Sequence, residues 1–410
     1  MIKLIRLLIT FLLLIETNFF GIIKIPEIIY NVIGYKTKYL LLFFSFLLFF
    51  FYVIAGKPAS KKKANFKFAI YFLILSTLVI TLLSMGIYRE NILYSFKMSY
   101  YYLIPISYLF FSVYFSDETV LRKFINTFVF IGTLYSLIII LQVFVYKYLG
   151  IVFLNFHEKG IGEFVVRSYG IRIARPESYI VFSYILLLIR VYMRYGNKIL
   201  NYVYICIHLF YIFTISMTRV SMIMCGILGL FLCYMLIKDK SRLISYLLVF
   251  LIIVLVITFG SELVLQLLYG EESRISSLMI RLNEVSFYAS QFFNNIFFGR
   301  GFPSDNNYYY LNHGPEGKFF ITDVGVLGFL SIYGLIGIIF VMITSFKIFN
   351  LWKNTKKDTA NKNVIFILIL YLVMSLPTLF VLDPQRVIIL PIILAFIDFY
   401  SDRENERNIK

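Results

Sequence analysis

Runs of apolar residues, each long enough to cross a bilayer as a helix, recur along this sequence with short polar links between them. A helix of roughly 20 residues spans the hydrocarbon core, which is roughly 30 Å thick. Backbone polar groups find no partners in lipid, so such runs cross it as helices. Apolar residues make up 60% of the chain, against about 45–50% in soluble domains. The sequence therefore predicts an all-α, polytopic membrane helix bundle, with one transmembrane domain over 1–410.

Twelve spans are predicted, and the distribution of Lys and Arg among the links places both termini on the cytoplasmic side. Basic residues concentrate in alternate links, as the positive-inside rule describes. The formal net charge of +17 is spread over these links, so it indicates orientation in a membrane and not a nucleic-acid surface. The predicted spans are 1–23, 38–55, 66–86, 100–116, 124–148, 176–194, 199–216, 219–237, 243–260, 321–345, 364–382 and 387–400.

Two predicted external segments carry more arginine than orientation requires: an early loop, 149–175, and a large late loop, 261–320. A tight external turn between two short helices, at Ser216-Met217-Thr218-Arg219, adds one more. Guanidinium groups bind multiply charged anions through paired N–H donors, so these segments predict a site for an anion such as a pyrophosphate. The arginines are Arg167, Arg172 and Arg175 in the early loop, Arg219 in the turn, and Arg274, Arg281 and Arg300 in the late loop.

The late loop contains a short amphipathic helix, predicted over 278–293 from its helical periodicity. Such a helix lies on the membrane surface or packs over the mouth of the bundle. One interpretation is an ordinary interfacial helix with a solvated polar face. The other is a helix that presents a catalytic arginine, and Arg281 beside a glycine-rich loop and a histidine favours it. The apolar stripe is Leu278, Leu282, Val285, Ala289 and Phe292, and the polar stripe is Arg281, Glu284, Tyr288 and Gln291.

The chain has three histidines, of which His313 lies in the late loop. A neutral imidazole is a suitable general base near neutral pH, so His313 is either that base or a solvated loop residue. His208 falls within a predicted span, where we expect a hydrogen-bonded core residue. His157 is expected to be an ordinary residue of the early loop.

Asp323 opens the predicted span 321–345 in the stretch TDVGVLG. A carboxylate is favourable at a helix N-terminus, so capping and function both account for it. Small residues let transmembrane helices approach closely, and the glycines that recur along this span therefore predict helix packing. They are Gly325, Gly328, Gly334 and Gly337.

The predicted external loops hold no cluster of His, Cys, Asp or Glu with metal-ligand spacing, and the three cysteines all lie in apolar runs. We therefore expect no metal and no cofactor. The arginines would neutralise the charge that a divalent cation neutralises in other enzymes.

Four stretches resemble the bacterial O-antigen polymerase and O-antigen ligase superfamily, which includes the Wzy-like polysaccharide polymerases. They are RPESY after the early arginines, SMTRVSMI at the turn, RLNEVSFYASQFFNNIFFGRGF in the late loop, and DVGVLGFLSIYGLIG after it. The resemblance implies a membrane glycosyltransferase with a GT-C-like fold in the bacterial cytoplasmic (inner) membrane. It would polymerise undecaprenyl-pyrophosphate-linked oligosaccharides at the outer face, for an O-antigen, capsule or exopolysaccharide.

The resemblance also assigns residues. Arg281 matches the family arginine ahead of the FGRG-like turn, and Arg172 or Arg175 matches the arginine of the earlier external loop. His313 lies where the ligases keep a late-loop histidine, although the glycine spacing after it departs from the ligase pattern. Tyr308 and Tyr309 offer flat faces to sugar rings or belong to an interfacial aromatic belt. The predicted catalytic residues are Arg281, His313 and Asp323, and the predicted substrate-binding residues are Arg172, Arg175, Arg219, Arg300, Tyr308 and Tyr309.

Two other functions fit parts of the sequence. An O-antigen ligase would share the fold and differ in its acceptor. A lipid-linked oligosaccharide flippase would have similar size and charge, but it predicts similar halves and charges within spans, whereas here the charges gather in loops. The expected partners are the lipid-linked oligosaccharide and the bilayer, with a chain-length regulator and a flippase as candidates, and no nucleic acid.

Overall fold

The computed structural model is helical, with one short two-stranded hairpin in the part that it describes. Contacts between residues divide the chain into two compact units. Unit 1 comprises Met1–Ile54 and Tyr114–Ser245, and unit 2 comprises Ala55–Val113 and Tyr246–Lys410. The single transmembrane domain stays a prediction. The described residues are 2–17, 37–54, 64–115, 117–154, 164–167, 170–173, 177–216, 218–237, 272–356, 359–378 and 380–407.

Five helices among the described residues are long and apolar enough to cross a membrane. They are Lys67–Tyr88, Glu118–Leu149, Lys198–Ser216, Arg219–Ile237 and Leu335–Asn354. Two shorter apolar helices, Lys38–Ile54 and Ala360–Ser375, accompany them. The prediction of a helical membrane protein is confirmed, and the count of twelve spans stays a prediction. The predicted span 243–260 lies outside the described residues.

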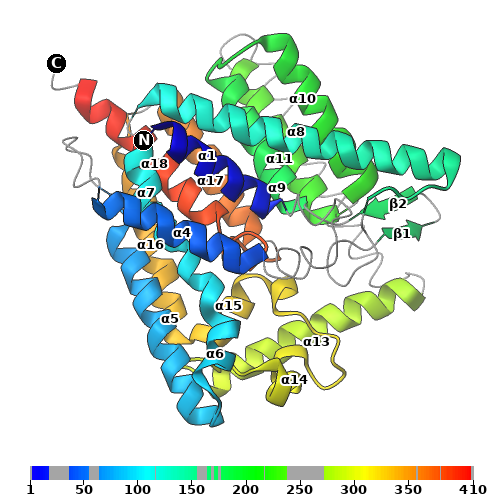
Figure 1. The fold of residues 1–410 in the computed structure, drawn as a ribbon, viewed down its shortest axis with the longest axis vertical. Coiled ribbons are helices and arrows are strands. Elements are labelled where there is room, and N and C mark those ends of the chain that lie inside the picture. The colour runs from blue at the N-terminus through cyan, green and yellow to red at the C-terminus, as the bar shows by residue number, and fades with distance from the viewer. Residues whose placement is uncertain are drawn as a thin grey trace. The chain divides into compact units, whose positions relative to one another are not determined.

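Unit 1 is built around helix α9, in which every residue from Tyr179 to Arg190 is buried. Helices α8, α10 and α11 all contact α9, and Figure 1 shows these four helices gathered together. Asp117 and Asn197 cap the starts of α8 and α10. The elements are α1 (Ile2–Glu16), α4 (Thr37–Ile54), α8 (Glu118–Leu149), β1 (Phe164–Arg167), β2 (Gly170–Ile173), α9 (Glu177–Tyr192), α10 (Lys198–Phe210), the π-helical turn η2 (Tyr211–Ser216) and α11 (Arg219–Ile237).

Two predictions about unit 1 are confirmed. The stretch 199–237 forms two helices separated after Ser216 rather than one long helix. His208 is a buried core residue, whose ring nitrogens lie 2.9 Å from Ser183 Oγ and 2.8 Å from Tyr204 O. Gly132 allows this arrangement, because a Cβ there would collide with Ser183.

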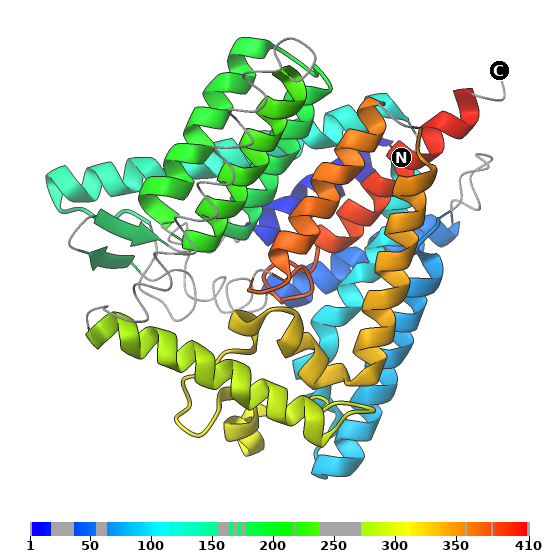
Figure 2. The ribbon, with the colours of Figure 1, turned by 180° about the vertical axis from the view of Figure 1, so that it is seen from behind.

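Unit 2 is built around helix α18, which is buried throughout Ile389–Tyr400. Helices α16 and α17 pack on α18, and the three lie side by side in Figure 2. Helix α7 (Tyr108–Tyr114) belongs to unit 2 except for its last residue. The elements of unit 2 are α5 (Lys67–Tyr88), α6 (Ile92–Ser99), the 3₁₀ helix η1 (Tyr100–Ser107), α13 (Glu272–Asn294), α14 (Asp305–His313), the 3₁₀ turn η3 (Ile321–Val324), α15 (Val326–Tyr333), α16 (Leu335–Asn354), α17 (Ala360–Ser375) and α18 (Ile389–Arg407).

The prediction of one continuous span over 321–345 is wrong. The stretch is divided into η3, α15 and α16 at Gly325 and Gly334, whose φ angles are +55° and +59°. L-residues rarely adopt this region, so glycine here ends one helix and starts the next. The candidate membrane span is α16 alone.

Candidate functional site

The glycine-rich part of the late loop is fixed by backbone contacts to the end of α15. Arg300 N and Gly301 N donate hydrogen bonds to Ser331 O (2.8 Å) and Ile332 O (3.1 Å). These carbonyls are free to accept because the helix stops at Gly334. A Cβ on Gly299 would collide with Ile332 O, so the FGRG sequence permits the close approach that places Arg300.

The same segment is also held by the end of α5. Phe302 N donates to Ser84 Oγ (2.8 Å), and Ser304 N donates to the buried carboxylate of Glu90 (3.1 Å). Tyr88 donates its hydroxyl hydrogen to Arg300 O (2.7 Å). The loop is therefore an ordered part of unit 2 at these positions.

Helix α13 holds the other side of the late loop through its polar stripe. Glu284 Oε1 accepts from Phe320 N (3.1 Å), Tyr288 donates to Asn312 O (2.6 Å), and Gln291 donates to Leu311 O (2.9 Å). All three side chains are buried, while the apolar residues Leu282 and Val285 are 48% and 45% exposed. The interpretation of α13 as a helix with a solvated polar face therefore holds only at Arg281, which is exposed. Glu284, Tyr288 and Gln291 on the same face pack on protein.

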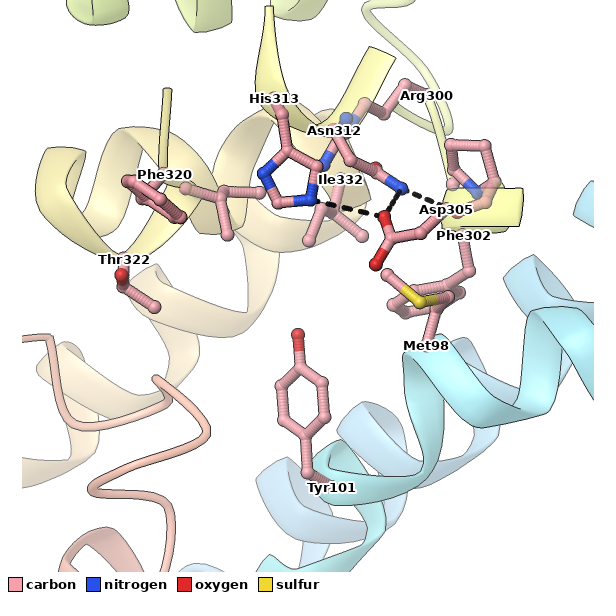
Figure 3. Close-up of a pocket in the computed structure, with 13 residues that line it drawn as sticks. Met98, Tyr101, Arg300, Phe302, Asp305, Asn312, His313, Phe320, Thr322 and Ile332 are labelled. Carbon is pink, nitrogen blue, oxygen red and sulfur yellow. Dashed lines mark hydrogen bonds and ion pairs between the residues drawn. The ribbon is translucent and has the colours of Figure 1, made fainter. Parts of the chain in front are cut away.

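A cavity of about 200 Å³ opens between α14, the loop before it, η3 and the segment from α6 to η1. Figure 3 shows His313, Asp305 and Asn312 on one side and Tyr101 pointing toward them from the other. The remaining labelled wall residues are Met98, Arg300, Phe302, Phe320, Thr322 and Ile332.

His313 is oriented by two contacts. Its Nδ1 lies 3.2 Å from Phe319 O, a carbonyl that can only accept, so Nδ1 carries the proton of a neutral ring. Its Nε2 faces Asp305 Oδ1 at 3.4 Å, beyond the usual hydrogen-bond range. Asn312, near the other end of α14, donates to that Oδ1 at 2.7 Å. Nε2 is thus available to a hydroxyl group in the cavity.

Two predicted catalytic residues, Arg281 and Asp323, do not line the cavity. The charge of Arg281 acts on the pKa of Asp323. Burial raises the pKa of Asp323, and the charges of Arg281 and Arg386 lower it by less. The residue is nevertheless exposed to solvent. The Asp323 carboxylate accepts from Thr322 Oγ1, and no side-chain hydrogen bond caps the start of α15, so within the described residues Asp323 does not cap that helix.

Burial likewise raises the pKa of Glu284, and here too the neighbouring charges have smaller effects. The buried carboxyl of Asp383, in the turn before α18, accepts from Arg386 at 2.6 Å, and burial raises its pKa to about 8. Asp323 adds to that rise. Arg281, Asp323, Asp383 and Arg386 are therefore electrostatically coupled to one another.

The predicted sugar-stacking tyrosines lie away from the cavity wall. Tyr308 packs against Tyr88, with ring centroids 4.9 Å apart, and donates to Tyr88 O. Tyr309 is 51% exposed and lies against the His313 ring, at 4.3 Å between centroids. The aromatic rings on the cavity wall are those of Tyr101, Phe302 and Phe320.

Unit 1 brings the early loop to the predicted turn. Strand β2, which carries Arg172, contacts η2, and Arg219 begins α11 just beyond it. Glu177 accepts hydrogen bonds from Thr218 Oγ1 (2.7 Å) and Ser221 Oγ. Arg175 and His157 lie outside the described residues.

Sequence reasoning missed Asp305, Tyr101 and Glu90. A usable signal existed for Asp305: Ser304 is an N-cap residue type, and an acidic residue follows it. That pattern predicts the start of α14. No protein-family model and no curated protein matches the chain. Its function therefore has to follow from the chemistry of these residues.

Proposed function

We propose that this protein is a membrane glycosyltransferase that polymerises undecaprenyl-pyrophosphate-linked oligosaccharide repeat units into a surface polysaccharide. The observation that carries the proposal is the late-loop cavity, where His313, Asp305 and Arg300 meet. The resemblance of the late-loop stretches to the O-antigen polymerases supports it. The proposed enzyme has twelve spans in a GT-C-like arrangement in the bacterial inner membrane, with both termini inside, and it uses no metal or cofactor.

In the proposed reaction, a hydroxyl of the acceptor sugar attacks C1 of the donor glycan. The bond between C1 and the pyrophosphate oxygen breaks, and undecaprenyl pyrophosphate leaves. The hydroxyl proton goes to a base, and His313 Nε2 suits this role because its partner nitrogen is already engaged by Phe319 O. Asp323 is the second candidate base, since its raised pKa brings it nearer to neutral pH.

Negative charge accumulates on the leaving pyrophosphate, and a guanidinium placed in advance stabilises it. We assign this role to Arg281. It is exposed on α13 beside Met279 and Leu282, which are 54% and 48% exposed, so it suits a carrier whose chain stays in lipid and whose pyrophosphate lies at the interface. Arg172, Arg175 and Arg219 stay proposed substrate-binding residues of unit 1.

The test is the length of the surface polysaccharide in cells that carry Arg281→Ala, measured on a gel with the membrane level of the protein measured in parallel. We expect collapse to single repeat units with the protein still present. Lys318→Ala is the matched control, because Lys318 is a basic residue of the same loop, 63% exposed and paired with Glu316. It should leave full-length polymer.

Full-length polymer from Arg281→Ala would remove Arg281 from the reaction. Loss of all surface glycan, with lipid-linked units retained inside the cell, would favour a flippase. Polymer of normal length that stays on its lipid carrier would favour a ligase.

A further inference from the structure

Arg300 carries a buried positive charge without an acidic partner among the residues described. Its side chain is 6% exposed. Nη1 donates to Leu311 O, and Nε has no acceptor. The aromatic ring of Tyr288 lies 5.6 Å from its Cζ. A buried cation with unused donors is costly, and burial lowers the pKa of Arg300. An anion in the adjoining cavity would complete this site.

The size and walls of that cavity suit one sugar ring. Its volume of about 200 Å³ is enough to admit one sugar ring. Tyr101, Phe302 and Phe320 supply aromatic side chains, with the Tyr101 hydroxyl pointing into the space in Figure 3, and Thr322 and Asn312 supply polar groups. A sugar ring has apolar faces, which suit the aromatic side chains, and hydroxyl groups around its edge, which suit the polar ones.

The charges in the cavity favour a ligand with one negative charge. Asp305 also lines the cavity and is 44% exposed. One of its carboxyl oxygens accepts from Asn312 and lies 3.4 Å from His313 Nε2, and the other faces the open space toward Tyr101 in Figure 3. A pyrophosphate would be attracted by Arg300 and repelled by this carboxylate. A sugar with one carboxylate would pair with Arg300 and donate its hydroxyls to Asp305.

We propose that the late-loop cavity is a subsite for a sugar that bears a single negative charge, such as a uronic acid, with its carboxylate on Arg300 and its hydroxyls on Asp305. This inference rests on the proposed function, because it assigns the cavity to one sugar of the glycan substrate. The glycan that the protein joins then contains an acidic sugar.

The test is binding of sodium glucuronate, glucose and inorganic pyrophosphate to the purified full chain in detergent, followed by saturation-transfer NMR titration. We expect glucuronate to bind at least about tenfold more tightly than glucose, because a charge-assisted hydrogen bond is gained. Arg300→Met should remove that preference and leave glucose binding unchanged. Equal affinity of the two sugars for the unsubstituted protein would overturn the proposal.

A second variant covers the possibility that Arg300→Met does not fold. Thr322→Phe keeps Arg300 and fills the cavity from its wall, so it should abolish glucuronate binding while the thermal unfolding midpoint stays unchanged. Retained binding in Thr322→Phe would overturn the proposal. Pyrophosphate that displaces glucuronate and binds more tightly would assign Arg300 to the lipid carrier and overturn it as well.

These outcomes are separate from those of the polysaccharide assay. Glucuronate binding that depends on Arg300, together with full-length polymer in Arg281→Ala, would retain the subsite and reject the role of Arg281 in polymerisation. Collapsed polymer in Arg281→Ala, together with equal affinity for glucose and glucuronate, would retain the polymerase and reject the acidic sugar.

Discussion

Two opposing effects set the pKa of the Asp383 carboxyl group: burial and the neighbouring Arg386. Asp383 is 6% exposed, and Arg386 donates to it at 2.6 Å. Removing a carboxylate from water disfavours its charged form, and a nearby guanidinium favours it. Burial prevails here, since the pKa of Asp383 is raised from 3.8 to about 8.

Stability should therefore fall as the pH rises from about 4 to about 8. The folded protein keeps the Asp383 proton up to the raised pKa, whereas the unfolded chain loses it near pH 4, so the folded state binds the extra proton in this range. The decline is at most about 1.4 kcal/mol per pH unit. Asp383→Asn cannot ionise, so its thermal unfolding midpoint should vary less with pH.

The quantity to compare is the slope of the thermal unfolding midpoint against pH. The midpoint itself will also change, because Asp383→Asn leaves Arg386 without its carboxylate. Glu316→Gln is the matched control. Its carboxyl is 68% exposed, so it should keep the slope of the unsubstituted protein. Equal slopes in Asp383→Asn and the unsubstituted protein would contradict the raised pKa.

Single residues of the site could be found in the sequence, but their partners could not. Arg281, Arg300 and His313 stand out because ionisable residues are rare in an apolar chain. Glu90, which holds Ser304 N, is 214 residues away from it, and no local pattern connects the two. For the same reason, the sequence leaves Asp323 open as either a helix cap or a functional residue, since its charged neighbours are distant in the chain.

Between α15 and α16, the chain turns at Gly334 rather than continuing as one helix. Leu335 N donates to Ile296 O (2.6 Å), and Gly334 N donates to Leu330 O (2.7 Å). A Cβ on Gly334 would collide with Ile296 O and approach Gly299 N at 2.5 Å. Both neighbours are backbone atoms that side-chain rotation cannot move. The break therefore fixes the segment that carries Arg300.

Gly334→Ala should destabilise the protein and disturb the late loop. The φ angle of +59° costs an L-residue roughly 1–3 kcal/mol, before the collision with backbone is added. Gly86→Ala is the matched control, since a Cβ there meets nothing within 4 Å and alanine favours a helix by about 0.5–1 kcal/mol. The measurement is the thermal unfolding midpoint, which should drop by several degrees in Gly334→Ala alone. An unchanged midpoint in both variants would reject the break as a fixed structural element.

At the element scale, hydropathy predicted where most described helices lie but not where they break. The division near Ser216 was found because 199–237 is too long for one span. The division at Gly334 was missed because glycine is common inside transmembrane helices, and only the contact with Ile296 shows that a positive φ is needed. The burial of Glu284, Tyr288 and Gln291 was missed because periodicity separates two faces without showing which one meets protein.

For the whole molecule, the side of the membrane that the late loop faces decides whether the proposed function is possible. Helix α16 has 20 residues and so is roughly 30 Å long, enough to separate the late loop from the links that follow it. Lysines gather from the last turn of α16 to the first turn of α17, at Lys353, Lys356, Lys357 and Lys362. The positive-inside rule predicts that this end lies in the cytoplasm, and the proposed function requires the late-loop cavity to open on the outer face.

This orientation predicts opposite labelling of two introduced cysteines at the two ends of α16. Lys318→Cys, in the exposed part of the late loop, should react with a membrane-impermeant maleimide in intact cells, with the outer membrane opened where one is present. Lys353→Cys, near the C-terminal end of α16, should react only after the inner membrane is permeabilised. The unsubstituted protein, with Cys206, Cys225 and Cys233 in helices, gives the background. Reversed labelling would place the cavity in the cytoplasm, where lipid-linked repeat units are made and not joined, and the polymerase proposal would have to be abandoned whatever the Arg281 variant shows.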